Sequence, residues 1–466
     1  MERTVARDAV RRRRACRAAA ACLLLCSAVS TAGSARTASA VRPPRLTYSE
    51  STLPNGLRLI VHEDHSTPIV NVQVWYHVGS KNERPGRTGF AHLFEHLMFQ
   101  GSKNVEPEQH TSLVSGVGGQ ANAYTNEDVT VFWETVPSQY LPMVLWLEAD
   151  RMATLRIERG GFEREREVVK EERRMRVENQ PYGLLSEIVN GHAFTVHPYG
   201  HPIIGTMADL EAASVEDVRA FYRTFYVPAN ATVVIAGDVD GQDAAALATR
   251  YFGRIPRSEH PVPRDIPAEP PHAKPRRLTV EERWPLPVVV VAHHVTFDGH
   301  PDSYAIHMAS KILSDGQSSR IYRRLVYETG IALSAAGIAN LTEHPNLFYA
   351  YAVVQPGHTT AEAEQALVKE LDRLRTEPVA ERELTRAKNQ FARDIVLSRE
   401  TVQQKAGILA RASVLRGGDV GSADAEFDLF QGVTAADIQR VAQAYFAPGN
   451  RIVITVTPKL AEGDKE

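Results

Sequence analysis

Two stretches of the chain follow one pattern: Ser214-Val-Glu-Asp-Val-Arg-Ala-Phe-Tyr-Arg-Thr-Phe-Tyr-Val-Pro-Ala-Asn230 and, 220 residues later, Thr434-Ala-Ala-Asp-Ile-Gln-Arg-Val-Ala-Gln-Ala-Tyr-Phe-Ala-Pro-Gly-Asn450. In each, a Ser or Thr that can cap a helix precedes an amphipathic stretch, and Pro-x-Asn then predicts a turn. A run rich in β-branched residues follows, at 231–236 and at 451–456, and predicts a strand. The chain therefore contains two similar halves.

Other segments support this division. Residues 68–78 and 287–295 both predict a buried strand that is followed by a helix. Seven prolines fall within residues 256–275, and proline this dense continues neither a helix nor a central strand. We predict an α+β fold of two homologous domains, each a mixed, mostly antiparallel sheet covered by helices. The predicted parts are a first domain at 41–255, a linker at 256–275, a second domain at 276–460 and a tail at 461–466.

The N-terminus has the layout of a secretion signal. Arginines at 11–14 and 17 precede an apolar run at 18–29, and small residues at 38–40 offer a cleavage site. We therefore predict that residues 1–40 direct export to the periplasm or the extracellular space. No later apolar run is long enough to span a bilayer, so we expect no membrane span in the mature chain. A lipid anchor attached at Cys26 is an alternative that the sequence leaves open.

Composition narrows the kind of site to expect. The 466 residues include 53 basic and 56 acidic side chains, so the chain lacks the basic surplus typical of nucleic-acid binding. All three cysteines lie within residues 16–26, inside the predicted signal. The mature chain then has neither disulfides nor thiolate ligands, and any metal must be held by histidine and carboxylate.

A histidine pair lies in the segment Gly89-Phe-Ala-His92-Leu-Phe-Glu95-His96-Leu-Met-Phe-Gln-Gly101. Residues four apart share one face of a helix, and two neutral imidazoles there suit Zn²⁺. The carboxylate of Glu95 lies beside them and can take a proton from water. Apolar residues of the same segment are expected to anchor the helix in the core: Phe90, Leu93, Leu97 and Met98. A third ligand is still needed.

The charged stretch 163–175 offers carboxylates for that role. Most of it is expected to face solvent, as charge runs usually do. Glu165, Val168, Val169 and Glu172 nevertheless share one helical face, and apolar residues between two carboxylates indicate that this face turns inward. An inward carboxylate needs a partner, which a metal or a ligating histidine would supply.

The H-x-x-E-H motif and Glu165-Arg-Glu-Val-Val-Lys-Glu-Glu172 together resemble the pitrilysin/insulinase family of zinc metallopeptidases, in its short-chain, processing-peptidase-like subgroup. In that family a glutamate 76 residues after the second histidine completes the metal site, and 172 − 96 is 76. The resemblance implies that His92, His96 and Glu172 hold Zn²⁺ and that Glu95 is the catalytic base. It also implies that Glu165 steadies a ligand histidine, with Glu171 as the fallback ligand.

The likeness covers nearly all of residues 45–458. It includes segments 197–205 and 316–322, and Gly118-Gly-Gln-Ala-Asn122-Ala-Tyr-Thr125, which resembles the family's edge strand. There an extended substrate docks by strand addition, which implies that Asn122 and Ala123 pair with its backbone. The resemblance implies a zinc metalloendopeptidase that hydrolyses unfolded peptides inside a clamshell chamber. Two rivals stay open: a non-catalytic scaffold subunit, and a peptide-binding module in which zinc is structural.

The second half serves as an internal control. Setting Gly316 against Gly101 places His307 opposite His92, Lys311 opposite His96 and Ser310 opposite Glu95. This copy of the helix cannot form the site, so we expect one zinc ion per chain, in the first half.

Active relatives also supply an Arg and a Tyr from the second domain, and these donors face the developing oxyanion. Val326 and Leu333 stand at the matching positions here, and neither can donate a hydrogen bond. One interpretation is a heterodimer in which a homologous partner contributes the missing pair; a homodimer would lack it. The other is a shifted register, in which a nearby donor substitutes: Arg323, Arg324 or Tyr327.

A second histidine cluster comprises His192, His197 and His201. Its spacing falls among Pro198, Gly200 and Pro202, which break any helix. We predict a turn with hydrogen-bonded imidazoles there rather than a second metal site.

Overall fold

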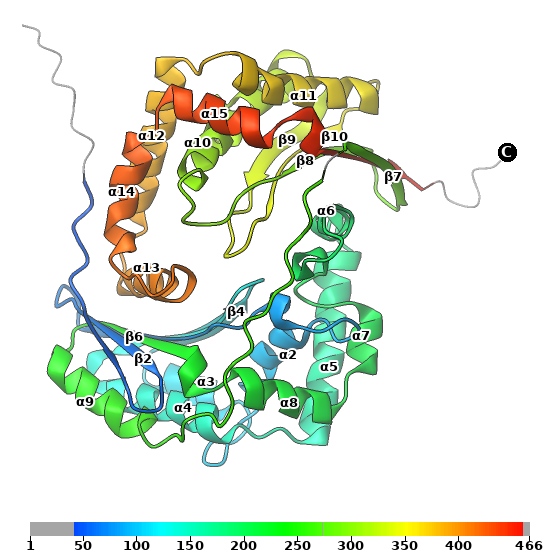
Figure 1. The fold of residues 1–466 in the computed structure, drawn as a ribbon. Coiled ribbons are helices and arrows are strands. Elements are labelled where there is room, and N and C mark those ends of the chain that lie inside the picture. The colour runs from blue at the N-terminus through cyan, green and yellow to red at the C-terminus, as the bar shows by residue number, and fades with distance from the viewer. Residues whose placement is uncertain (1–41, 273, 460–466) are drawn as a thin grey trace, which may run out of the picture. The chain divides into compact units, whose positions relative to one another are not determined.

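The structure is a computed structural model that describes residues 42–272 and 274–459. The predicted secretion signal and the 461–466 tail lie outside these residues. From Pro43 onward the described residues belong to one compact unit, in which the two predicted halves are in contact (Figure 1). Among the described helices, none is both long and apolar enough to pass through a lipid bilayer.

The first half builds a six-stranded sheet whose spatial order is β1-β2-β6-β3-β5-β4. Only β2 and β6 run parallel to each other; every other neighbouring pair is antiparallel. The strands are β1 (Ser49–Thr52), β2 (Arg58–Glu63), β3 (Ile69–Tyr76), β4 (Gln120–Thr125), β5 (Thr130–Pro137) and β6 (Ala231–Gly237).

The second half builds a five-stranded sheet in the order β7-β11-β8-β10-β9, again with one parallel pair, β7 with β11. This is the order of the first sheet without its β1 strand, so the repeat predicted from the sequence is confirmed at the level of topology. The strands are β7 (Arg276–Glu282), β8 (Val288–His294), β9 (Ala332–Ala339), β10 (Leu347–Val354) and β11 (Arg451–Pro458).

Helices lie between strands along the chain in both halves. Those of the first half are α2 (Phe90–Leu97), α3 (Gln109–Gly116), α4 (Leu141–Thr154), α5 (Arg159–Arg173), α6 (Leu185–Ala193), α7 (Met207–Ala212), α8 (Val215–Phe225) and α9 (Gly241–Phe252). Those of the second half are α10 (Ser303–Ser314), α11 (Thr360–Thr376), α12 (Glu381–Leu397), α13 (Val402–Leu415), α14 (Ser422–Gly432) and α15 (Ala435–Tyr445).

The repeated segments that predict the two halves fold as expected. The hydroxyl of Ser214 accepts a hydrogen bond from the Asp217 backbone N–H at 3.1 Å, which caps α8. Thr434 makes the equivalent 3.1 Å bond to Asp437 and caps α15. Each cap satisfies a backbone N–H that the first helical turn leaves unpaired. Strands β6 and β11 then follow their turns.

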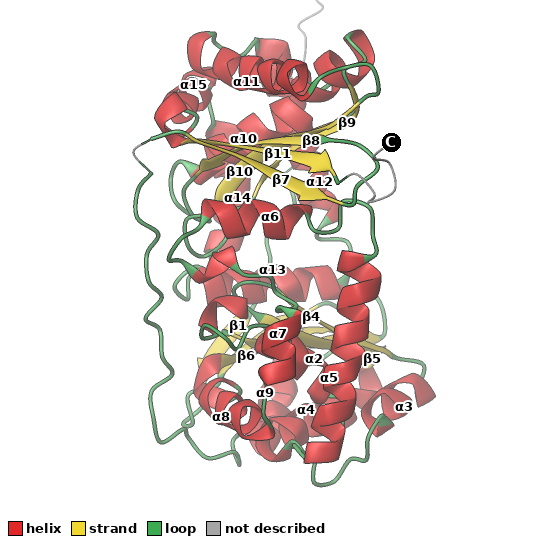
Figure 2. Ribbon diagram, turned by 90° about the vertical axis from the view of Figure 1, so that its right-hand side faces the viewer, coloured by secondary structure: helices red, strands yellow, loops and turns green. Residues whose placement is uncertain are grey.

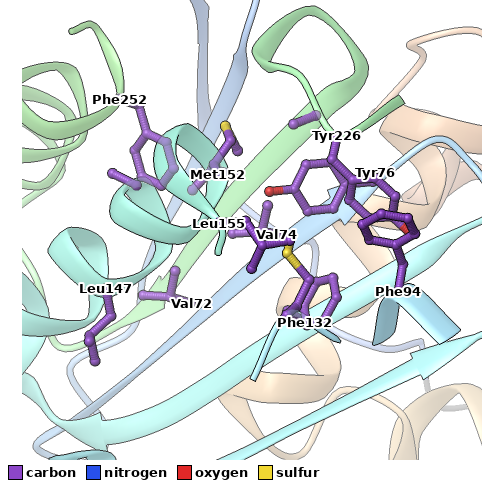
Figure 3. Close-up of a cluster of buried hydrophobic side chains, with 14 of the residues drawn as sticks. Val72, Val74, Tyr76, Phe94, Phe132, Leu147, Met152, Leu155, Tyr226 and Phe252 are labelled. Atoms are coloured by element: carbon purple, nitrogen blue, oxygen red, sulfur yellow. The ribbon is translucent and has the colours of Figure 1, made fainter. Parts of the chain in front are cut away.

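The core of the first half lies between its sheet and its helices. Figure 3 shows Val74 of β3 and Phe132 of β5 on the side of the cluster where Phe94 of α2 lies, and Val72 beside Leu147 of α4; Val72, Val74, Phe132 and Phe94 are all fully buried. Tyr226, just after α8, stacks on the Phe94 ring with 4.7 Å between the centroids. The helix that carries the H-x-x-E-H motif is thus fixed by the core.

Each half also covers the other's sheet. Helix α13 of the second half packs on β3 and β6, where Leu409 and Ala410 join a buried cluster with Trp75 and Val234. Helix α6 of the first half packs on β8, and Val189 joins a separate buried cluster there. Figure 2 shows α6 and α13 between the two sheets. The central strands of both sheets are therefore buried on both faces, which explains why most of their side chains are apolar.

A charged cluster joins the two halves. Glu343, in the loop between β9 and β10, contacts Lys81 and lies 2.7 Å from the His77 Nε2 atom. The backbone N–H of Glu343 donates a hydrogen bond to Asp128 at 2.9 Å, and Asp128 also accepts one from Lys81 at 2.8 Å.

The predicted linker, residues 256–275, forms no helix or strand in its described part, which leaves out residue 273. Its Glu269 carboxylate accepts hydrogen bonds from the backbone N–H groups of residues 195, 196 and 197.

Candidate metal centre

Helix α2 presents His92, Glu95 and His96 because its other face is held in the core. The predicted anchors Phe90, Leu93, Leu97 and Met98 are buried, and Phe94 joins them. The helix begins after Gly89, whose φ is 88°, and a Cβ there would lie 2.6 Å from the Ile204 carbonyl oxygen. Glycine is therefore required at this close approach.

The N-terminus of α2 has a buried cap. The carboxylate of Glu83 accepts from the backbone N–H groups of Gly89 at 2.7 Å and Ala91 at 2.8 Å. Burial raises the pKa of Glu83 well above its usual value, although these hydrogen bonds oppose the rise. The cap fixes the direction in which the helix enters the site.

Helix α5 supplies the carboxylates. Arg173, at its end, is buried and forms a two-pronged ion pair with Glu187 at 2.7 and 3.0 Å. Arg173 also donates to the Gly205 carbonyl at 2.8 Å, and Gly205 packs directly against Gly89. Because one guanidinium reaches the loop that contacts the start of α2, it sets α5 relative to α2.

One detail of the predicted α5 face is wrong. Val169 is fully buried, but Val168 is 48% exposed. The inward face is centred on Phe162, Glu165, Val169 and Glu172, which recur at helical spacing, while Val168 lies to one side of that stripe.

The three predicted ligands converge. Ligand atoms of His92, His96 and Glu172 all lie within 4.8 Å of one another. The Glu172 Oε2 atom lies 3.1 Å from His96 Nε2 and 3.8 Å from His92 Nε2. Glu165 lies behind His96, with its Oε2 atom 3.4 Å from Nδ1. The side chains are half-buried, so the cluster borders solvent on one side.

This donor set fits zinc. Two imidazoles and one carboxylate are the ligands of many catalytic zinc sites, and tetrahedral bonds of ~2.1 Å place ligand atoms roughly 3.4 Å apart. The two measured separations bracket that value. The Nε2 atom of His92 faces the Glu172 carboxylate at 3.8 Å, so it is the ring nitrogen placed to bind a metal, and the buried Nδ1 atom has no hydrogen-bond partner among the described residues.

The two histidines differ electrostatically. Burial and, to a smaller extent, the neighbouring His96 together lower the pKa of His92 to about 4, so His92 is neutral at pH 7. Burial also lowers the pKa of His96, but the carboxylates of Glu165 and Glu172 outweigh that effect and raise it to about 9. His96 lowers the pKa of Glu172 in turn. A divalent cation would replace the proton that His96 and Glu172 share.

Glu95 is placed to act as a base. It lies beside the cluster, one residue before His96, and its Oε2 atom accepts a 2.8 Å hydrogen bond from the Thr125 hydroxyl of β4. Burial raises the pKa of Glu95, an effect that the Thr125 hydrogen bond opposes. A carboxylate with a raised pKa is a better proton acceptor near neutral pH.

Strand β4 forms the edge of the first sheet, as the sequence predicts. Asn122 is exposed, and its Oδ1 atom accepts from the Ala123 backbone N–H at 2.8 Å. This local bond occupies an edge N–H that an added strand would use, so the Asn122 side chain has to move before a strand can pair here.

Two residues near the cluster were not identified from the sequence. Thr125 is the last residue of the edge-strand motif, and only the packing of β4 against α2 brings its hydroxyl to Glu95. Arg176 donates to the Glu172 Oε1 atom at 2.5 Å from a π-helical turn, Arg174–Glu178, that continues α5. The sequence signal that could have identified Arg176 is its position four residues after Glu172, which places the two side chains on the same helical face.

The fallback ligand and the second histidine cluster lie elsewhere. Glu171 is exposed and pairs with Arg174 at 3.0 Å, away from the histidine pair. His197 and His201 lie in a turn and each has a ring nitrogen within hydrogen-bonding distance of a backbone group, as predicted, whereas His192 belongs to helix α6 and its Nδ1 atom lies 2.8 Å from the Ile188 carbonyl oxygen.

A second buried group, His110, Glu134 and Glu148, also has ligand atoms within 4.8 Å. The Arg151 guanidinium contacts both of its carboxylates. Because a buried cation already pairs with both carboxyl groups, we interpret the group as a structural ion cluster.

The second half replaces the site with an ion pair. Lys311 stands on α10 where His96 stands on α2, and its Nζ atom lies 2.7 Å from the Asp394 carboxylate of α12. Leu333 is exposed on β9, and Val326 packs against the second core. Arg323 pairs with Glu328 at 2.7 Å.

Two family models match the chain. Residues 58–207 match the model described as insulinase (peptidase family M16), and residues 212–391 match the one described as peptidase M16 inactive domain. The first match lies within the first half, and the second runs from the end of the first half into the second.

Whole-length relatives agree with these matches. Zinc protease PqqE of Helicobacter pylori is 29% identical over 414 residues, which cover 88% of this chain and 93% of that protein. The mitochondrial-processing peptidase subunit beta of Lentinula edodes is 27% identical, covering 85% and 86%. A solved protease structure from Helicobacter pylori superposes with a TM-score of 0.85 at 29% identity, covering 89% of this chain and all of that one.

Proposed function

The chain belongs to the insulinase family, peptidase family M16, and on this premise we propose that it is a zinc-dependent metalloendopeptidase acting on unfolded peptides. The observation that carries the proposal is the convergence of His92, His96 and Glu172 beside Glu95. If these residues only formed a polar surface facing solvent, two carboxylates of α5 would have no reason to face two imidazoles of α2 in a half-buried site.

In the proposed mechanism the ligands are His92, His96 and Glu172, with Glu165 orienting His96. Zinc bound there would polarise the peptide carbonyl and make water more acidic. Glu95 takes the proton from the attacking water and later delivers it to the departing amine. The Thr125 hydroxyl holds the Glu95 carboxylate in position, and the partly buried setting keeps that carboxylate basic.

We propose that substrate binds as an added strand along the free edge of β4. Backbone pairing with Asn122 and Ala123 tolerates many sequences, which suits unfolded substrates. Substrates would then be selected more by whether they fit into a chamber between the domains than by the identity of most of their side chains.

Cleavage of an unfolded protein such as casein, with zinc and with a chelator, tests this function. We expect zinc-dependent cleavage that Glu95→Gln abolishes while the metal stays bound. Equal activity of Glu95→Gln and the unaltered chain would refute the proposed mechanism.

We further propose that full activity needs a homologous partner subunit. Val326 and Leu333 cannot donate to an oxyanion, and one such donor is worth about 2.7–4 kcal/mol. The relative from Lentinula edodes is itself named as a subunit. Adding a partner that carries the missing Arg and Tyr should raise kcat by about a hundredfold or more.

The same two residues favour a second candidate function, a peptide-binding subunit whose zinc is structural. That function predicts peptide affinity without turnover even when the partner is present.

We also propose, from the sequence of residues 1–40, that the protein is exported. N-terminal sequencing of the protein recovered outside the cytoplasm would test this.

A further inference from the structure

A cavity of about 500 Å³ lies where the two halves meet, on the face of β4 opposite to α2. From the first half, Trp75 of β3 and Tyr124 of β4 line it. From the second half, the helix pair α10 and α12, together with α13, closes it. The cavity therefore borders the helices that correspond to the metal-binding pair of the first half.

Most of the cavity wall is apolar, and the charged side chains that line it are paired: Lys311 with Asp394, Arg399 with Asp424, Arg411 with Asp298 and Arg416 with Glu426. Aromatic and aliphatic side chains line it, including Phe391, Ile395 and Ile408, and the Trp75 and Tyr124 rings meet edge to face at 6.0 Å. The Lys311 ammonium pairs with Asp394, and the Arg399 guanidinium lies 2.7 Å from Asp424. An occupant that brings its own charge would find no unpaired counterion in these two pairs, whereas an apolar group would be stabilised.

Strand geometry links the cavity to the metal centre. Successive side chains of a strand point to opposite faces of the sheet. On β4, Thr125 points to Glu95, and the preceding residue, Tyr124, points into the cavity and is 40% exposed. A peptide paired with β4 alternates in the same way, because directly opposed residues point to the same face.

We propose that this cavity is a specificity pocket for an aromatic or large aliphatic side chain of a peptide paired with β4. The inference rests on the proposed function, since it requires strand addition at this edge. The side chain that enters lies opposite Tyr124, and the next residue of the peptide faces Glu95 and the histidine pair. Cleavage should therefore occur at a fixed distance from a large apolar residue.

Gly407 offers a way to fill the pocket. It lines the cavity on α13, and a Cβ there would make only ordinary contacts of 3.7 and 3.9 Å with the Gln73 side chain. Gly407→Leu should fold and occupy the space. Gly432→Leu is the matched control, because Gly432 is also helical, lies outside the cavity lining and would present an added Cβ to open space.

The experiment measures binding as well as cleavage. A fluorescent glycine- and serine-rich peptide is compared with versions in which one Phe is moved along the sequence. Binding uses the full-length Glu95→Gln chain, and far-UV circular dichroism checks that the Gly407→Leu and Gly432→Leu chains are folded. Burying one aromatic side chain should improve the Kd at least about tenfold.

We expect the Phe-dependent gain in affinity to disappear in Gly407→Leu and to persist in Gly432→Leu. In the active chain the cleaved bond should move with the Phe. Phe-dependent binding that Gly407→Leu leaves intact would overturn the pocket, even if cleavage continues and the proposed function stands. Phe-dependent binding that Gly407→Leu removes, without any cleavage, would support the pocket and refute the peptidase function. Absence of peptide binding would overturn the pocket.

Discussion

The helix pair α2–α5 of the first half and the helix pair α10–α12 of the second occupy equivalent places on sheets of the same topology. In the first pair, His96 faces Glu172; in the second, Lys311 faces Asp394. Each pair therefore sets a nitrogen-bearing side chain against a carboxylate. In the second half the ammonium group is itself the cation that the carboxylate needs.

The two helix pairs differ in whether they offer a metal the nitrogen lone pairs that it needs. Replacing an imidazole by an ammonium keeps the carboxylate paired but removes the lone pair that a metal requires. In the first half, His92 adds a second imidazole, which is neutral at pH 7, and Glu95 adds a carboxylate beside the pair. In the second half, His307 has no such neighbour: it packs edge-on against the Phe391 and Phe430 rings.

The largest difference should appear at the base. Glu95→Gln keeps the size of the side chain but removes its ability to accept a proton, so kcat should fall by about 10²–10⁴-fold with zinc content unchanged. Ser310→Ala, at the equivalent position of α10, should leave kcat within twofold, roughly the scatter of surface substitutions. Peptide cleavage and metal analysis of both variants check this contrast; an equal loss in both would erase it.

A smaller effect is expected at Thr125. Thr125→Val removes the hydroxyl that donates to Glu95, so we expect kcat to fall about tenfold, the value of one hydrogen bond to a charged group. KM should change little because the backbone of β4 is unaltered. Thr376→Val, in α11 of the second half, removes a hydroxyl that bonds only to the Asp372 carbonyl and serves as the control. Unchanged kcat in Thr125→Val would show that Glu95 is positioned without it.

Lys311 should matter for stability and not for the metal. Lys311→Met leaves Asp394 with the Arg393 contact alone, and we expect the free energy of unfolding to fall by about 1–2 kcal/mol. Zinc content should not change. Urea unfolding measures the loss, and Lys369→Met, an exposed lysine on α11, should be neutral. A loss of zinc in Lys311→Met would contradict the separate roles of the two helix pairs.

The smallest expected effect concerns the contact between the halves. Burial favours the neutral acid, but His77 and Lys81 outweigh it and lower the pKa of Glu343 to about 2. A carboxyl group with a lowered folded-state pKa stabilises the fold above its unfolded pKa, near 4.5, and loses that contribution as the pH falls toward 2.

Glu343→Gln should therefore be less stable than the unaltered chain at pH 7, and the difference should shrink between pH 4.5 and pH 2. Urea midpoints across that range measure it, and Glu400→Gln, an exposed position, controls for general acid effects. A difference that stays constant with pH would show that the Glu343 charge does not stabilise the contact.

Local patterns predicted most of the fold. The caps at Ser214 and Thr434 and the strands after each Pro-x-Asn turn are set by neighbouring residues, so they can be recognised from the sequence. The convergence of Glu172 on His96 was expected from family spacing, because periodicity alone cannot say which helix packs against which.

Long-range packing could not be predicted in this way. The exchange of α6 and α13 between the sheets depends on how the halves meet, which no local pattern encodes. Val168 was assigned to the inward face because two positions of a helix about 100° apart can both border one stripe, and only the packing of α5 selects Val169. The Lys311–Asp394 pair likewise joins residues on two separate helices.

The central claim is that only the first helix pair binds a metal, and zinc content per chain tests it most directly. We expect one zinc ion per unaltered chain after loading and removal of excess metal. We expect none in the double variant His96→Lys with Glu172→Asp, which recreates the second-half pair and should remain folded by circular dichroism. Zinc retained in that variant, or absent from the unaltered chain, would contradict the account.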